Sequence, residues 1–281
     1  MQRTVLILIP AHNEQNRIGS TLESMLSHLN QKKGLQARLV VVLNGCDDGT
    51  QEVVDGYTSK DPRVERLVYH ERIGKGGALI EGLKLWPTAE VVAYIDADGS
   101  CPPEEITRLI EMCGEDEMII GSRWLPESQI IEAQSRLRRF LSRGFHWLVQ
   151  GLFGMGIRDT QCPAKAIGKG VLRATYDRLN IADFAFDVNL LYSAHKMGFR
   201  IRETPIAWRD VLGSKVTANL GRASTAMFLS IVRLRLVDTR FYRRLAFLRP
   251  FESWVYQRLG AAVPRRSAES TQIGTTADID R

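Results

Sequence analysis

"VVAYIDADGSCPPEEI", residues Val91 to Ile106, joins an apolar run to two closely spaced aspartates and then to a turn rich in glycine, serine and proline. The apolar part, Val91–Ile95, predicts a buried strand, so Asp96 and Asp98 fall at its carboxyl end. Charges beside a core are costly unless something binds them. Carboxylate oxygens suit Mg²⁺ or Mn²⁺, and substrate phosphates can complete such a site. Taken alone, however, the triplet fits a plain turn or a helix N-cap better.

The rest of the first half alternates between strand and helix patterns. Apolar runs at Thr4–Ile9 and Ala37–Leu43 predict strands, and helix-period leucines occupy Glu14–Leu29. The alternation continues through Val64–Tyr69, Ala78–Leu85, Val91–Ile95 and the helical Glu104–Met112. This order is typical of an α/β fold whose parallel sheet is covered by helices on both faces. Ligands of such sheets bind beyond the carboxyl ends of the strands, so we expect the loops there to meet.

Two further polar loops belong to that edge. "PAHNE", residues 10–14, offers Asn13 and Glu14 after the first strand, and "NGCDDGT", residues 44–50, offers Asn44, Asp47 and Asp48 after the second. Such side chains can hydrogen-bond a base and a ribose, while the glycines allow close approach of the backbone. Ordinary turn chemistry is the alternative interpretation.

A glycine-rich turn follows the third predicted strand. "RIGKGG", residues 72–77, places Lys75 at the start of a predicted helix. Backbone N–H groups and an ammonium favour a phosphate at such a place. The turn lacks the spacing of a Walker A motif, so read alone it is a weak indication of phosphate binding.

The second half begins with a predicted amphipathic helix at residues 135–153, "SRLRRFLSRGFHWLVQGLF". Its leucines and phenylalanines share one face, and Arg136, Arg139 and Arg143 recur every three or four residues on the other. Guanidinium groups suit phosphate oxygens, so the stripe predicts a phosphate-binding surface. Apolar, arginine-containing segments follow at 225–236 and 241–259, and such helices can lie in a lipid interface. A core-facing helix with a solvated basic face, or an oligomer interface, is the alternative.

The amino-acid composition limits the classes of molecule that this protein is expected to bind. The chain has 281 residues and a net charge of +6, which suits nucleic acid, anionic lipid or a phosphorylated substrate. The arginines are interleaved with aliphatic residues and no recognition motif occurs, so we expect no nucleic acid. The four cysteines have neither zinc-knuckle nor disulfide-framework spacing, and the N-terminus does not resemble a signal peptide. We expect a cytoplasmic protein, peripheral at the cytoplasmic face of the membrane.

Seven motifs resemble, in the same order, those of the family 2 inverting glycosyltransferases with the GT-A fold. They are LIPAHNE, RIGKGGALIEGL, YIDADGS, GSR at 121–123, LSRGF at 141–145, IRDTQCPAK at 157–165 and FAFDVNLL at 184–191. The last three are most similar to polyprenyl- or dolichyl-phosphate hexosyltransferases. The resemblance runs from about Val5 to Val216. It implies an α/β, Rossmann-like, mostly parallel sheet flanked by helices, with C-terminal amphipathic helices.

The resemblance also implies how the chain is organised. Residues 1–125 would form a nucleotide-sugar-binding half and 126–216 the acceptor-binding half of the same domain. Residues 217–262 would be an amphipathic helical region. The tail at 263–281 has little to bury and is expected to be disordered.

Roles are implied residue by residue. The nucleotide sugar would contact Pro10, Ala11, Asn13, Glu14, Asn44, Lys75 and Asp96; the metal would sit on Asp96 and Asp98; Asp98, Arg123, Asp159, Gln161 and Asp187 would be catalytic, with Thr160 beside them; Arg136, Arg139 and Arg143 would receive the acceptor phosphate. The implied cofactor is Mg²⁺ or Mn²⁺. The implied donor is UDP-glucose, with GDP-mannose possible, and the implied acceptor is a polyprenyl phosphate at a membrane surface.

The implied reaction is an inverting displacement of the nucleoside diphosphate by an acceptor phosphate oxygen. An anionic phosphate needs no strong general base, so Asp159 and Asp187 are expected to orient the acceptor, the sugar or an arginine. A saccharide or other hydroxyl acceptor would instead need a base. Because Leu43 and Asn44 replace the family's usual aspartates, a catalytically silent nucleotide-sugar-binding protein is a further alternative. Pro163 and Ala164 also depart from the family pattern, and a homo-oligomer is possible.

Overall fold

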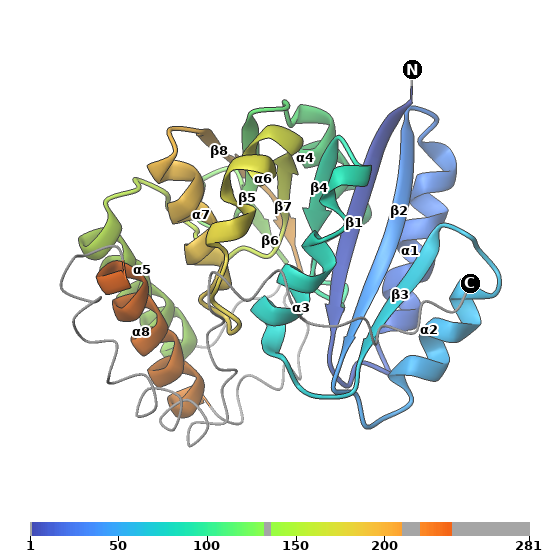
Figure 1. Cartoon of the computed structure of the whole chain (residues 1–281), viewed down its shortest axis with the longest axis horizontal. Helices are drawn as coiled ribbons and strands as arrows, with labels where there is room; N and C mark the ends of the chain where they lie inside the picture. Colours follow the sequence, from blue (N-terminus) through green and yellow to red (C-terminus); the bar gives the residue numbers. More distant parts are fainter. Residues whose placement is uncertain (1, 132–135, 210–219, 238–281) are drawn as a thin grey trace.

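The computed structural model describes residues 2–131, 136–209 and 220–237; within them, the side chains of residues 136–141, 220–224 and 237 are not described. Its centre is a seven-stranded sheet with strand order β3-β2-β1-β4-β7-β5-β8 (Figure 1). The strands are β1 (Arg3–Ala11), β2 (Leu35–Asn44), β3 (Val64–Tyr69), β4 (Val91–Tyr94), β5 (Glu117–Ser122), β7 (Lys165–Gly168) and β8 (Arg200–Pro205). A small parallel pair, β6 (Gln129–Ile130) with β9 (Ala207–Trp208), lies outside this sheet.

Helices cover both faces of the sheet. One face carries α1 (Ile18–Gln31), α2 (Thr50–Thr58) and α4 (Pro103–Met112), and the other carries α3 (Gly74–Leu83), α6 (Lys169–Thr175) and α7 (Phe186–Lys196). Successive residues of β1 alternate between the two cores, because strand side chains point to opposite faces: Ile7 packs with the first set of helices and Leu8 with the second. At one end of the molecule, α5 (Arg136–Phe153) lies against α8 (Leu220–Val237) (Figure 1).

One strand runs against the others. β7 pairs antiparallel with β4 and with β5, whereas β1, β2, β3, β4, β5 and β8 all point the same way. The loop that precedes β7 therefore reaches the edge where the parallel strands end. This reversal adds residues 158–164 to the loops that the sequence had already predicted to meet there.

The predicted strands and helices of the first half are confirmed, with shifted ends. Helix α1 begins at Ile18 rather than Glu14, because residues 12–17 form a loop whose Asn13 and Glu14 are hydrogen-bonded to Asp47 and Thr50. The predicted helix at 135–153 is α5, and residues 225–236 lie in α8. Helices α2, α6 and α7 and strands β5 to β9 were not predicted. The segments at 241–259 and 263–281 lie outside the described residues.

The turn that carries Lys75 rests on the chain leading into α7. The Gly77 N–H donates to the Ala182 carbonyl at 2.9 Å, and a Cβ at Gly76 would lie 2.4 Å from the Ile181 carbonyl oxygen. The next residue of that chain, Asp183, accepts a hydrogen bond from Ser230 of α8 at 2.5 Å. The turn, α7 and α8 are thereby packed together.

Across the described ranges, none of the helices has the length and apolar character that crossing a bilayer requires.

We expect Gly76→Ala to destabilise the protein by about 1–3 kcal/mol, because its methyl group would meet backbone oxygens that cannot move away. Gly56→Ala is the matched control: Gly56 is exposed in α2, nothing lies near its Cβ position, and the helix propensity of alanine should add up to about 1 kcal/mol. Urea unfolding of both variants measures the difference, and equal effects would contradict the packing described for Gly76.

Candidate active site at the carboxyl edge of the sheet

The loops after β1 and β2 are joined by hydrogen bonds. Asn13 donates through its amide to the Asp47 carboxylate and accepts the Asp47 N–H at 2.9 Å, and the Glu14 N–H donates to Thr50 Oγ1 at 2.7 Å. Asn13 has φ +57°, a left-handed conformation that asparagine tolerates better than most residues. Convergence of the PAHNE and NGCDDGT loops is confirmed, and Pro10 and Ala11 end β1 directly beneath them.

The side chain of Asn44 forms a structural hydrogen bond at this edge of the sheet. Its side chain is buried, its Oδ1 accepts the Ile73 N–H at 2.7 Å, and its backbone carbonyl lies 2.8 Å from His12 Nδ1. Asn44 thus ties the end of β2 to the turn that carries Lys75. Its neighbour Leu43 is a core residue. Contact of Asn44 with a nucleotide stays a prediction.

Lys75 reaches Asp96. Its Nζ lies 2.5 Å from Asp96 Oδ1, and both side chains are largely covered. Burial opposes the charge of the lysine, but the carboxylates of Asp96, Asp187 and Asp98 together raise its pKa above the ordinary value. Burial raises the pKa of Asp96 as well, against the opposing charge of Lys75. The sequence placed both residues at this edge, but it gave no sign that they pair.

Asp98 lies two residues further on, in the turn after β4. One of its oxygens, Oδ1, accepts the Ser100 N–H at 3.0 Å. No set of three or more His, Cys, Asp or Glu side chains within the described residues converges as a metal site. The Asp96 and Asp98 oxygens are nevertheless hard donors of the kind that Mg²⁺ and Mn²⁺ prefer, and substrate phosphates commonly supply the remaining ligands. The residues present fit such an ion.

Arg123 is fixed by Asp159. The guanidinium makes a two-pronged contact, Nε to Oδ2 at 2.8 Å and Nη2 to Oδ1 at 3.0 Å, and the Arg123 backbone N–H adds a third bond at 3.0 Å. Burial disfavours the Asp159 charge, but Arg123 holds the pKa of that carboxyl below its usual range. The indole of Trp208 lies under the guanidinium, 5.4 Å away. Asp159 therefore orients an arginine.

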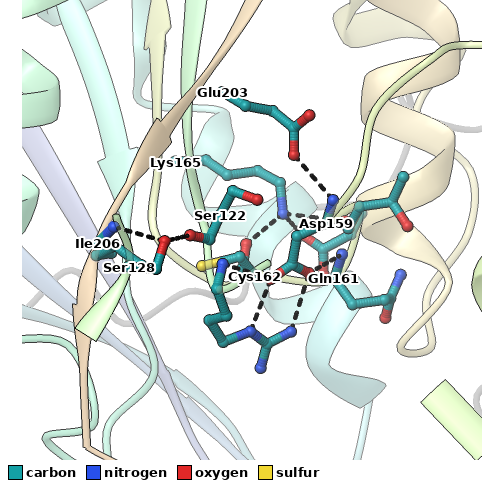
Figure 2. Close-up of polar contacts among 11 residues, drawn as sticks. Ser122, Ser128, Asp159, Gln161, Cys162, Lys165, Glu203 and Ile206 are labelled. Atoms are coloured by element: carbon teal, nitrogen blue, oxygen red, sulfur yellow. Dashed lines mark hydrogen bonds and ion pairs between the residues drawn. The ribbon is translucent and has the colours of Figure 1, made fainter. Parts of the chain in front are cut away.

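The loop before β7 is hydrogen-bonded to Glu203 of β8. Glu203 accepts the Arg158 N–H at 2.8 Å. It also accepts the Asp159 N–H at 2.9 Å (Figure 2). The Gln161 N–H in turn donates to Asp159 Oδ1 at 3.2 Å. Burial raises the pKa of Cys162 to about 12, so this thiol stays neutral and is a poor nucleophile.

Asp187 belongs to a buried network rather than to an open surface. Its Oδ1 lies 2.5 Å from Lys165 Nζ and 2.5 Å from the Tyr94 hydroxyl, and Lys165 is completely buried. Lys165 also donates to the carbonyls of Thr160 and Cys162, at 3.3 and 2.5 Å (Figure 2). Burial raises the pKa of Tyr94 well above its usual value, so the phenol remains a donor. The geometry suits positioning of the loop, and direct contact between Asp187 and the reacting groups stays a prediction.

Several polar atoms of residues around the loop before β7, and one on α5, are buried without a hydrogen-bond partner in the described part of the chain. They are Ser122 Oγ, Gln161 Nε2, Trp208 Nε1 and His146 Nδ1. Buried polar groups almost always find a partner, so such a group calls for a ligand or water. Sequence reasoning missed Trp208, Lys165 and His146, because tryptophan and histidine in apolar runs and a lysine inside a short strand carry no local signal of their partners.

Helix α5 lies beside this region. Phe145, Val149 and Leu152 pack against the core, and the His146 imidazole packs edge-on against Trp124 at 5.0 Å between centroids. Arg143 is exposed, whereas the side chains of Arg136 and Arg139 lie outside the described residues. The core-facing interpretation is therefore confirmed for the second half of the helix. Trp147 is 72% exposed, a large apolar side chain facing outward.

Comparison with known proteins identifies the relatives. The family model described as glycosyl transferase family 2 matches residues 6–177. The chain is 32% identical over 241 residues to the dolichyl-phosphate beta-glucosyltransferase of Dictyostelium discoideum, covering 82% of this chain and 73% of the relative. It is 30% identical over 242 residues to the human protein of the same name, covering 82% and 74%.

Solved structures share the fold. Glucosyl-3-phosphoglycerate synthase from Mycobacterium tuberculosis, in complex with Mn²⁺, UDP-glucose and phosphoglyceric acid, superposes with a TM-score of 0.63 at 16% identity, covering 85% of this chain and 81% of that one. A complex of the same protein with Mg²⁺ and UDP gives 0.62 at 17% identity, covering 85% and 81%. The expected GT-A fold is confirmed.

We expect Lys165→Met to cost about 3–5 kcal/mol of unfolding free energy, because it leaves the Asp187 carboxylate buried and without its cation. Lys165→Met combined with Asp187→Leu removes both charges and should recover most of that loss. Lys32→Met breaks a lysine–carboxylate pair at the surface, with Glu111, and should cost less than about 1 kcal/mol. Chemical denaturation compares the three proteins, and a single variant no worse than Lys32→Met would refute the buried pair.

Proposed function

Because the chain belongs to glycosyl transferase family 2, we propose that it transfers glucose from UDP-glucose, with inversion, to a polyprenyl phosphate of the dolichyl type. This chain covers two thirds or more of the length of several relatives named dolichyl-phosphate beta-glucosyltransferase, from Dictyostelium, Drosophila and human. Their name supports both the sugar and the acceptor. A structural neighbour crystallised with UDP-glucose supports the nucleotide at the level of the fold.

The choice of acceptor rests on one observation, the pairing of the Asp159 and Asp187 carboxylates with basic side chains. Asp159 is bound by Arg123 and Asp187 by Lys165, and both are almost completely buried. A carboxylate held this way is a poor general base. On accepting a proton it would become neutral and would lose its ion pair with the cation. A phosphate acceptor is already anionic and needs no such base, whereas a hydroxyl acceptor does. The arrangement therefore favours a phosphate nucleophile over the alternative of a saccharide hydroxyl.

After β4, Asp96 and Asp98 would hold Mg²⁺ or Mn²⁺ with the diphosphate of the donor. When bound, such an ion stabilises negative charge on the departing nucleoside diphosphate. Lys75 lies 2.5 Å from Asp96 and would contribute a second positive charge on the same side. The loops carrying Asn13, Glu14 and Asn44 would enclose the nucleoside.

After β5, Arg123 would orient the attacking phosphate oxygen toward the anomeric carbon. Its guanidinium is immobilised by Asp159 and by the ring of Trp208, so little conformational entropy remains to be lost when a phosphate binds. Gln161 lies on the same loop, where its amide could reach the sugar or the phosphate. The basic stripe of α5, with Arg136, Arg139 and Arg143, would draw the acceptor in.

The lipid acceptor implies work at a membrane surface. Exposed apolar side chains, Trp147 on α5 and Phe228 and Leu236 on α8, accompany the basic residues of these two helices. Tryptophan and arginine together suit the headgroup region of a bilayer. We propose that the protein acts peripherally, at the cytoplasmic face of the membrane.

Transfer is tested with radiolabelled UDP-glucose and GDP-mannose, Mg²⁺ or Mn²⁺, and a polyprenyl phosphate. We expect label from UDP-glucose to become extractable into organic solvent and label from GDP-mannose to remain in water. Lipid-soluble label from GDP-mannose alone would make the donor a mannose nucleotide. No lipid-soluble label with either donor, but labelled saccharide with a sugar acceptor, would overturn the phosphate acceptor.

We expect Asp98→Asn to lower kcat at least about 100-fold, because loss of a metal-binding charge removes several kcal/mol of transition-state stabilisation. Asp116→Asn is the control, since Asp116 is exposed just before β5, at the opposite edge of the sheet. Steady-state rates over a Mn²⁺ titration measure both variants. Equal activity in the two would exclude Asp98 from the metal site.

A further inference from the structure

His146 extends the basic stripe of α5. It follows Arg143 by three residues and Arg139 by seven, and residues at these spacings lie on one side of an α-helix. Arg143 is exposed, and His146 is half-buried, so the stripe passes from the surface into the protein at this point.

The imidazole contacts Trp124 in the turn after β5. Its ring packs edge-to-face on Trp124, the residue after Arg123, at 5.0 Å and 61°. On its other side lies Trp147, at 5.7 Å and 67°. Two indoles therefore border the imidazole, and one of them belongs to the residue that follows Arg123.

Within the part of the chain that the structure describes, one nitrogen of this ring lacks a hydrogen-bond partner. His146 Nδ1 is buried and has no hydrogen-bond partner among the described residues. Trp208, whose ring lies under the Arg123 guanidinium, has a buried Nε1–H in the same condition. An indole N–H can only donate, and an imidazole nitrogen can donate, so both suit an oxygen-rich anion. Unpaired buried groups of this kind are costly unless a ligand satisfies them.

We propose that His146 is a ligand of the acceptor phosphate, donating a hydrogen bond from Nδ1 to a phosphomonoester oxygen that lies between Arg143 and Arg123. The inference rests on the proposed function and extends it. It assigns to His146 the binding of the acceptor phosphate between the arginines of α5 and the reaction centre. Trp124 and Trp147 hold the imidazole in place, and their rings are suited to contact the first isoprene unit of the lipid.

The competing interpretation is that His146 merely fills space between two indoles. In that case a phenylalanine of similar shape would serve equally well. The two interpretations differ at one atom, so replacing the nitrogen while keeping the ring separates them. Asparagine places an amide near the position of Nδ1, whereas glutamine places its amide near that of Nε2.

The experiment measures binding of farnesyl phosphate to the full-length protein by tryptophan fluorescence, because Trp124 and Trp147 flank the site. We expect His146→Phe to raise Kd about 10-fold, as expected for loss of one hydrogen bond to a charged group. His146→Asn should remain within about 3-fold of wild type, and His146→Gln should resemble His146→Phe. Farnesol, which lacks the phosphate, should bind all variants alike. His195→Phe, at an exposed histidine of α7, is the matched control.

Each result has a separate meaning. Unchanged affinity of His146→Phe for farnesyl phosphate would overturn the role of His146 while leaving the proposed function intact. Equal losses for farnesol and farnesyl phosphate would make the role one of packing, which also overturns the proposal. If wild-type protein failed to bind farnesyl phosphate at all, the lipid-phosphate acceptor itself would fail, and the inference with it. Thermal melting of His146→Phe guards against unfolding, and rescue by asparagine ties any loss to Nδ1.

Discussion

Strand β7 runs opposite to β4 and β5, its neighbours on either side, and the composition of the active edge depends on that reversal. A parallel strand would have delivered its following loop to this edge. β7 delivers its preceding loop instead, with Asp159 and Gln161. The same reversal puts Lys165, the first residue of β7, just beneath the loop, where its ammonium can reach the Thr160 and Cys162 carbonyls.

Buried charge at this edge is organised in pairs. Asp96 faces Lys75, Asp159 faces Arg123 and Asp187 faces Lys165. Burial removes water from each pair, and the free-energy cost of that loss is offset only by close, well-directed contacts between the partners. Such pairs fix the orientation of both side chains more than they stabilise the fold, because rotation of one partner would leave the charge of the other without compensation. The site therefore presents cations of fixed orientation to substrates whose reacting parts are phosphates.

The layers of the fold follow from local patterns, and the first half was predicted from them. Runs such as Thr4–Ile9 are apolar on both faces, which is typical of a central parallel strand. Strand β7 escaped prediction because four residues beginning with a lysine carry no periodicity. The predicted start of α1 was wrong, because residues 12–17 form a loop that is hydrogen-bonded to the loop after β2 and to Thr50 at the start of α2.

The candidate site was predicted as a set of loops but not as a set of contacts. Asp96, Asp98 and Lys75 were expected at one edge, and they are there. The Arg123–Asp159 pair joins positions 36 residues apart, and no spacing rule relates a cation to a carboxylate over that distance. Asn44 was expected to face a nucleotide, yet its Oδ1 holds the Ile73 amide. Such pairings depend on the sheet order, which the sequence pattern does not contain.

The place of β7 also bears on how the chain folds. β1 to β4 can pair with one another from contacts made early in the chain, but β4 completes its second edge only with a strand that follows β5, β6 and α5. Closing so long a loop is entropically unfavourable and slow compared with neighbouring pairings. During synthesis, the part that carries Asp96 would already be a sheet while its exposed edge at β4 still awaited residues 165–168. Until then, that edge presents unpaired backbone groups, and the chain is most prone to pairing with another copy of itself in this interval.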